Sequence, residues 1–164
     1  ESSSASGGEW DDSAPGAGAV YVFSRTDGAW SQEAFLKASN ADGDCGWADI
    51  VPSPTGDYFG ASVALSSGVL AVSAPGEDGS AIGGETDNSA PDAGAAYIFT
   101  RTNGVWIQVA YLKASNAEQS DFFGISISTS QDTIAVGAPW EDGNPGGGES
   151  NNEARSAGAV FIFQ

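Results

Sequence analysis

A stretch that occurs almost twice decides the fold. Residues 18–39 read GAVYVFSRTDGAWSQEAFLKAS, and residues 94–115 read GAAYIFTRTNGVWIQVAYLKAS, with fourteen of the 22 aligned positions identical. A third copy starts as GAVFIF at residues 158–163. A second block occurs as FGASVALSSGVLAVSAPGEDG at residues 59–79 and as FGISISTSQDTIAVGAPWEDG at residues 123–143. Self-similarity at a fixed period indicates a solenoid or a propeller.

The repeating unit is about 64 residues long and carries one insertion. The first block begins at residues 18, 94 and 158, so successive copies are offset by 76 and 64 residues. The extra 12 residues all lie between Asn40 and Phe59, because the matching stretch from Asn116 to Phe123 is shorter by that number. Four short strands in a repeat of this length are typical of one propeller blade.

Strand and turn signals are strong within each unit. Residues 20–26 are rich in β-branched and aromatic side chains and run into Asp27-Gly28, while the second copy runs into Asn103-Gly104. These dipeptides favour a type I′ hairpin, which needs positive φ at both central positions. No apolar pattern of period 3.6 persists, so essentially no helix is expected. The predicted fold class is all-β, with antiparallel four-stranded blades and about two and a quarter blades in this chain.

The repeats divide the chain into four segments of one propeller-type domain or fragment. Residues 1–39 hold the outer strands of a first partial blade, and residues 40–58 form an inserted acidic loop. Residues 59–115 make a complete blade, and residues 116–164 give the first three strands of a third blade. Nine strands do not close a ring. We therefore expect either a fragment of a longer propeller or copies that share strands and assemble into a ring or a filament.

Two short motifs resemble a known family. Phe59-Gly60 is followed by Ser73-Ala74-Pro75, and Phe123-Gly124 is followed by Gly137-Ala138-Pro139. This combination resembles the FG-GAP repeat of integrin α-subunit propellers, and the fuller pattern resembles bacterial surface and secreted FG-GAP proteins more closely. The resemblance implies an extracellular or cell-surface β-propeller with adhesion or recognition roles and calcium in some blade loops.

The calcium site of the integrin pattern does not carry over. In that pattern the ion lies in an acidic loop between the first and second strands of a blade. Here those positions are Ser66-Ser67-Gly68 and Ser130-Gln131-Asp132, which lack the required set of carboxylates. Any calcium in this chain is therefore expected in other loops.

Composition excludes several classes of site and partner. The chain has no histidine, so catalytic triads with histidine and His-ligated zinc are excluded. Cys45 is the single cysteine, which excludes an internal disulfide. The net charge of −17 repels nucleic acid and anionic membranes. This charge suits a calcium-rich exterior, although keeping a repetitive β protein soluble explains it equally well. The first residues, 1–8, lack a signal-peptide pattern, which suggests a removed signal or an excised piece.

The acidic loops after each Ala-Pro are the candidate calcium sites. They read GGEWDDSAPGAG from Gly7, GGETDNSAPDAG from Gly83 and GGESNNEARSAG from Gly147. Oxygen ligands alternating with glycine suit a hard cation, and Asx-turns within the loops are the alternative explanation. The candidate ligands are Glu77, Asp78, Glu85, Asp87, Asn88, Glu141, Asp142, Glu149, Asn151 and Asn152, with Asp42, Asp44 and Asp49 in the inserted loop.

Tryptophans beside the acidic loops offer a second kind of binding. Trp47 and Trp140 are candidate platforms for sugars, unless they cover a neighbouring loop or blade edge. A glycosidase needs two carboxylates in different environments. Because the acids here recur in equivalent loops, a repeated structural or binding role is favoured and no catalytic residue is predicted.

The predicted function is an extracellular structural or adhesive module. It acts through protein contacts or self-assembly, and calcium is the expected ion. A carbohydrate-binding, lectin-like propeller and a metal-free scaffold fragment of a larger surface protein are the alternatives.

Overall fold

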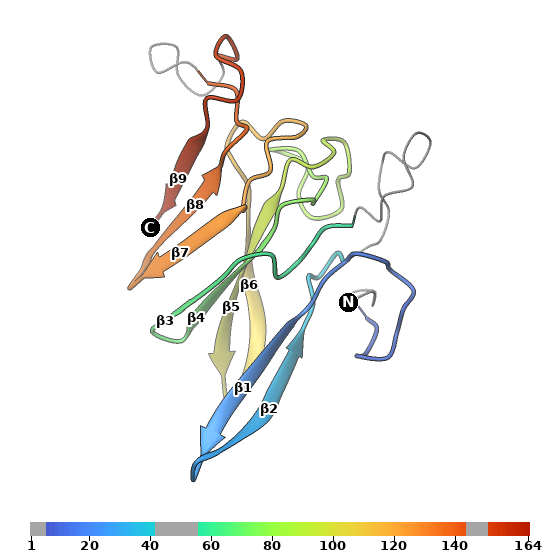
Figure 1. The fold of residues 1–164 in the computed structure, drawn as a ribbon, viewed down its shortest axis with the longest axis vertical. Coiled ribbons are helices and arrows are strands. Elements are labelled where there is room, and N and C mark those ends of the chain that lie inside the picture. Colours follow the sequence, from blue (N-terminus) through green and yellow to red (C-terminus); the bar gives the residue numbers. More distant parts are fainter. Residues whose placement is uncertain (1–5, 42–55, 144–150) are drawn as a thin grey trace.

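The protein is an all-β chain of nine strands (Figure 1). The computed structural model describes residues 6–41, 56–143 and 151–164, and this part of the chain contains no helix. The strands are β1 (Val20–Thr26), β2 (Ala29–Leu36), β3 (Val63–Ser66), β4 (Val69–Ala74), β5 (Ala95–Thr102), β6 (Val105–Leu112), β7 (Ser126–Ser130), β8 (Thr133–Ala138) and β9 (Ala159–Phe163).

The strands form three antiparallel sheets in which sequence neighbours are spatial neighbours. The first sheet is β1-β2, the middle sheet is β3-β4-β5-β6, and the last sheet is β7-β8-β9. This meander of short strands is the topology of a propeller blade. The predicted all-β fold class of antiparallel blades is confirmed.

Tight turns join the strands where the sequence predicts them. Asp27 and Gly28 have φ of 51° and 86°, and Asn103 and Gly104 have φ of 52° and 85°. Two positive φ values in a two-residue loop define the predicted type I′ turn. The hairpin turns lie at one end of the strands and the long acidic loops at the other (Figure 1).

One irregularity recurs in the first and middle sheets. The register shifts between Val22 and Phe23 on β1 and between Ile98 and Phe99 on β5, as a β-bulge does. Opposite the shift on β1, strand β2 has one extra, unpaired residue, Glu33, whose side chain reaches the middle sheet. There Glu33 Oε1 accepts from Arg101 Nε at 2.7 Å and from Trp106 Nε1 at 3.0 Å. The bulge therefore contributes a polar link between two sheets.

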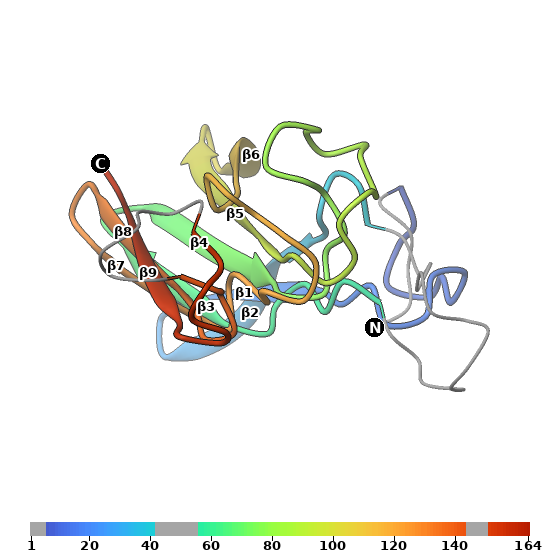
Figure 2. The same ribbon diagram turned by 90° about the horizontal axis from the view of Figure 1, so that it is seen from above.

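Apolar side chains fill the two spaces between the sheets. Along β5, Tyr97 and Phe99 pack toward the first sheet, whereas Ala96 and Ile98 pack toward the last. This follows from the alternation of side chains along a strand. Both faces of the middle sheet are thus covered, while each end sheet has one covered face. In the view from above, the C-terminus lies beside the last sheet (Figure 2).

Each Phe-Gly motif contacts a loop of the preceding sheet. Phe59-Gly60 contacts the loop before β1, and Phe123-Gly124 contacts the loop before β5. Phe123 N donates to Ala93 O at 3.0 Å, and Phe59 N donates to Ala17 O at 3.1 Å. Gly94 has φ of 82°, and a Cβ there would overlap the carbonyl oxygen of Phe123. Glycine is therefore required for this close approach of two backbones.

Candidate functional site

Two buried glutamates occupy equivalent places at the loop end of the sheets. Glu77 follows β4 and Glu141 follows β8, each three residues after the last residue of its strand. Glu77 is 1% exposed and Glu141 is 4% exposed. Burial of a carboxylate is unfavourable unless partners satisfy it. We call their surroundings the first and the second glutamate site.

Both carboxylate oxygens of Glu77 are satisfied in the first glutamate site. Glu77 Oε1 accepts from Asn40 Nδ2 at 3.1 Å, and Oε2 accepts from Lys113 Nζ and Gly79 N, both at 2.9 Å. Tyr97 Oη donates to Asn40 Oδ1 at 2.7 Å, which fixes the orientation of that amide. The site therefore combines residues from the first and middle sheets around one ion pair.

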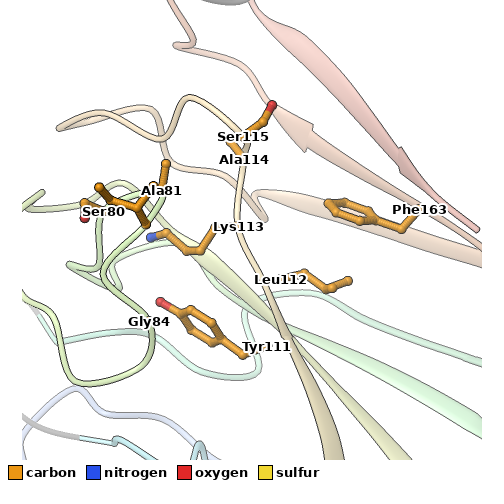
Figure 3. A pocket seen from close by; sticks show the side chains of 10 residues that line it. Ser80, Ala81, Gly84, Tyr111, Leu112, Lys113, Ala114, Ser115 and Phe163 are labelled. Carbon is orange, nitrogen blue, oxygen red and sulfur yellow. The ribbon is translucent and has the colours of Figure 1, made fainter.

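Lys113 reaches this site from the end of β6. Tyr111 and Lys113 point from the strand toward the loop that holds Ser80, whereas Leu112 points the other way, toward Phe163 (Figure 3). A groove of about 430 Å³ lies between this loop and the strand end. Because Lys113 Nζ pairs with Glu77 inside the protein, it is not available there as a free cation.

Burial and charge act in opposite directions on this ion pair. Burial lowers the pKa of Lys113, and the neighbouring Glu77 carboxylate partly restores it. Burial, followed by the charge of Glu77, raises the pKa of Tyr97 well above its ordinary value. Each charge of the pair is thus tolerated because the other is present.

The second glutamate site repeats the asparagine contact, and no cation contacts its glutamate among the described residues. Glu141 Oε1 accepts from Asn116 Nδ2 at 2.6 Å, as Glu77 Oε1 does from Asn40. Glu141 Oε2 has no hydrogen-bond donor, and no described residue stands where Lys113 stands in the first site. Burial, and then the nearby Asp121 carboxyl group, raises the pKa of Glu141 to about 7. Burial likewise raises the pKa of Asp121, so the two neighbouring carboxyl groups titrate as a coupled pair.

Asx-turns shape all three acidic loops. Asp11 Oδ1 accepts from Ser13 N at 3.0 Å, and Asp87 Oδ1 accepts from Ser89 N at 3.2 Å. In the third loop Asn151 Oδ1 accepts from the backbone N of Glu153 at 2.9 Å. The recurring register of these residues therefore has a local conformational explanation, the one that the sequence leaves open beside calcium.

Asp87 is the most strongly held carboxylate of these loops. Its Oδ2 also accepts from Ser80 N at 2.9 Å and from the Ser89 hydroxyl at 2.9 Å. These bonds, those from Ser80 first, lower the pKa of Asp87 to about 2. The side chain is ionised at any physiological pH and stabilises the loop conformation.

The remaining candidate ligands make separate contacts. Glu85 Oε1 accepts from Gln108 Nε2 at 2.8 Å, and Asp78 Oδ1 accepts from the backbone N of Asp92 at 2.8 Å. Asn152 donates to Glu118, Asp142 accepts from the backbone N of Ser156, and Asn88 lies in the loop before β5. Within the described residues, no group of three or more acidic or cysteine side chains is arranged to hold a metal ion. Calcium binding by these loops stays a prediction.

Several predicted residues lie outside the described part of the chain. They are Asp42, Asp44, Asp49 and Trp47 of the inserted loop, together with Glu149. The calcium and sugar predictions for these positions also stay predictions.

Trp140 lies half-exposed beside a polar groove. Its ring makes an edge-to-face contact with Phe122, with centroids 5.1 Å apart. The groove has a volume of about 360 Å³, and Glu118, Asp142 and Arg155 contribute to its lining. An aromatic ring with carboxylates and a guanidinium around it is a suitable surface for a polar ligand.

Sequence reasoning missed the partners of the buried glutamates. Asn40, Asn116 and Lys113 all belong to the repeated motif Leu-Lys-Ala-Ser-Asn. A polar pair kept in a repeat between apolar strands is a signal for such a role. In each repeat this polar pair lies in the Leu-Lys-Ala-Ser-Asn motif at the end of the second strand.

Comparison with known proteins identifies the repeats. The FG-GAP repeat model matches residues 53–99 and 106–163. No curated protein matches the chain. FG-GAP repeats are typical of extracellular or surface proteins and generally have structural or adhesive roles. Among the described residues, no helix is long and apolar enough to cross a membrane.

Proposed function

Because this chain belongs to the FG-GAP repeat family, we propose that it is an extracellular structural and adhesive module that binds copies of itself through its end sheets. The observation that supports this proposal is a difference in exposure between equivalent residues of the middle and end sheets. Large apolar patches left open to water mark interaction surfaces.

The outer face of the last sheet is one of these surfaces. Ile98 on β5 is 7% exposed because the last sheet covers it, whereas the equivalent Ile162 on β9 is 57% exposed. Likewise, Ala96 on β5 is buried, whereas the equivalent Val160 on β9 is 68% exposed. The last sheet therefore presents the face that the middle sheet uses to bind its successor.

The outer face of the first sheet is the other surface. Phe99 on β5 is 3% exposed beneath the first sheet, whereas the equivalent Phe23 on β1 is 52% exposed. Tyr97 is buried and the equivalent Tyr21 is partly open. The first sheet therefore presents the face that the middle sheet uses to bind its predecessor.

These two faces are complementary to each other. Within the chain, faces that carry Tyr97 and Phe99 or Phe161 and Phe163 pack on faces that carry smaller aliphatic side chains. The same pairing between two molecules joins Phe23 of one copy to Ile162 of the next. Such a head-to-tail contact gives a ring when its rotation closes and a filament when it does not.

Sedimentation velocity over a range of concentrations tests this proposal. Self-association that grows with concentration is expected, and Ile162→Lys or Phe23→Lys should each weaken it. Ile82→Lys is the matched control, because Ile82 is exposed in the loop between β4 and β5 and belongs to neither end sheet, so its replacement should leave association unchanged. A folded chain that sediments as a monomer at every concentration would contradict the proposal.

Carbohydrate binding is a second candidate, supported by the groove beside Trp140. The ring offers a stacking surface, and Asp142 and Arg155 offer hydrogen-bonding groups next to it. A glycan array is the test, with Trp140→Ala expected to abolish any signal. The control is Trp10→Ala, because Trp10 is a fully solvated tryptophan outside this groove. Equal signals from the parent chain and Trp140→Ala would contradict a sugar site at this groove.

A further inference from the structure

The first glutamate site brings an amine and an amide to the same buried carboxylate. Lys113 Nζ donates to Glu77 Oε2 at 2.9 Å, and Asn40 Nδ2 donates to Glu77 Oε1 at 3.1 Å. A buried ion pair is by itself weak evidence for stability, so a chemical role for these groups is worth deriving. We propose that this site forms an intramolecular amide bond between the side chains of Lys113 and Asn40, with Glu77 as the acid–base group.

The side-chain amide of Asn40 is fixed and polarised. Tyr97 Oη donates to Asn40 Oδ1 at 2.7 Å, and Asn40 Nδ2 also donates to Glu85 O at 2.9 Å. Together with the bond to Glu77, these contacts hold both ends of the amide. A donor on Oδ1 stabilises the negative charge that develops on this oxygen when an amine attacks the carbonyl carbon. Asn40 therefore presents an activated carbon, Cγ, to a nucleophile.

The surroundings exclude water and favour a neutral amine. The side chains of Lys113 and Glu77 are 6% and 1% exposed. The ring of Tyr97 packs edge-to-face on those of Phe59 and Tyr111, with centroids 5.4 Å and 5.3 Å apart. Burial lowers the pKa of Lys113, although the charge of Glu77 opposes this effect. Burial therefore favours transfer of a proton within the ion pair, which leaves a neutral amine and a neutral carboxyl group.

The reaction balances with the groups present in the site. Glu77 accepts a proton from Lys113, and the electron pair of Nζ then attacks Cγ of Asn40. The Nζ–Cγ bond forms while Tyr97 donates to the oxygen of the intermediate. Glu77 accepts a second proton from Nζ and returns one to Nδ2, so the Cγ–Nδ2 bond breaks and ammonia leaves. The products are an amide bond, ammonia and a protonated Glu77, and no oxidant or other reactant is needed.

The new bond would tie two sheets of the protein together. Asn40 follows β2 of the first sheet, and Lys113 follows β6 of the middle sheet. A covalent link that closes such a long stretch of chain restricts the unfolded state. Because Cys45 is the single cysteine, no disulfide within one chain supplies such a link. The described structure holds the two groups as they stand before the bond forms.

Intact-mass spectrometry of the folded chain tests the proposal. The mass should be lower than that of the sequence by the mass of one ammonia molecule, and a chain kept in urea and never folded should retain the full mass. After digestion, tandem mass spectrometry should find a branched peptide in which Lys113 is joined to Asn40. The branched peptide is the deciding readout, because Asn103-Gly104 loses the same mass when it forms a succinimide.

Two lysine variants locate the bond. Lys113→Arg keeps a cation beside Glu77 and cannot form the bond, so it should have its full sequence mass. Lys37→Arg is the matched control, because Lys37 holds the equivalent place in the first repeat and donates to Gly18 O. This control should lose ammonia as the parent does. A folded parent chain of full mass, or a loss of ammonia without the branched peptide, overturns the inference, and neither result depends on a variant that folds.

Discussion

The first and second glutamate sites differ in one charged group, and that difference teaches what the fourth strand of a blade contributes. Both sites hold a buried glutamate whose Oε1 is bound by an asparagine. Among the described residues, only the first site receives a lysine from a fourth strand, and there every oxygen of the glutamate is satisfied. The outer strand therefore completes the electrostatics of the blade as well as its hydrogen bonding.

Removing the lysine from the first site should leave its buried glutamate without a cation, and this change has the largest expected effect. Lys113→Met keeps most of the apolar stem but leaves Glu77 buried without its cation. The free energy of unfolding should fall by about 3–5 kcal/mol, measured by urea denaturation.

The double variant Glu77→Gln with Lys113→Met separates charge from packing. It removes both charges together and should recover at least half of that loss, because no buried charge remains unpaired. A single Lys113→Met that unfolds at the same urea concentration as the parent chain would show that the ion pair does not stabilise the blade.

The fold was predictable because its signals are local and repeated. The turn at Asp27-Gly28 needs only two residues, and the 64-residue period needs only self-comparison. The glutamate partners were not predictable in the same way. Asn40 and Glu77 are far apart in sequence and meet only when the first sheet packs on the middle one, a contact that no local pattern encodes.

The composition of the acidic loops likewise does not determine the role of their carboxylates. Composition alone favours oxygen ligands for a cation, and it does not reveal that Asp87 already accepts four hydrogen bonds from Ser80 and Ser89. The sequence therefore identifies these loops as acidic and leaves open whether their carboxylates bind a cation or form Asx-turns.

The glycines that precede β5 and β9 differ in how closely another backbone packs against them. Gly94 and Gly158 both have positive φ, but only Gly94 lies under the Phe-Gly motif of a following sheet. Gly94→Ala should therefore lower the free energy of unfolding by about 1–3 kcal/mol more than Gly158→Ala does. Parallel urea melts of the two variants measure this, and equal losses would mean that the motif does not hold the sheets together.

The second glutamate site should make stability depend on pH. Glu141 has its pKa raised from an ordinary 4.5 to about 7, through burial first and then Asp121. Between these values the folded chain keeps a proton that the unfolded chain releases, so stability from this group falls as pH rises through this window. The loss is on the order of 3 kcal/mol and is complete above about pH 7.

Comparison with Glu141→Gln isolates this effect from the other acidic groups nearby, Glu118, Asp121 and Asp142. The variant stays neutral at this position, so its melting temperature should fall less than that of the parent between pH 5 and pH 8. Parallel slopes for the two proteins would contradict a raised pKa at Glu141.

The smallest effect is expected at Asp87, where the sign is opposite. Hydrogen bonds lower the pKa of this exposed carboxylate to about 2, so its contribution is present above its ordinary pKa and is lost only as pH falls toward 2. Asp87→Ala should speed amide exchange at Ser80 and Ser89 by about tenfold and shift the melting temperature by at most about 2 °C. Asp87→Asn should keep the Ser89 amide protected, because Asn151 makes the same turn in the third loop. If Asp87→Asn exchanges as fast as Asp87→Ala, charge rather than turn geometry holds the loop, and a cation becomes the better explanation for its acidity.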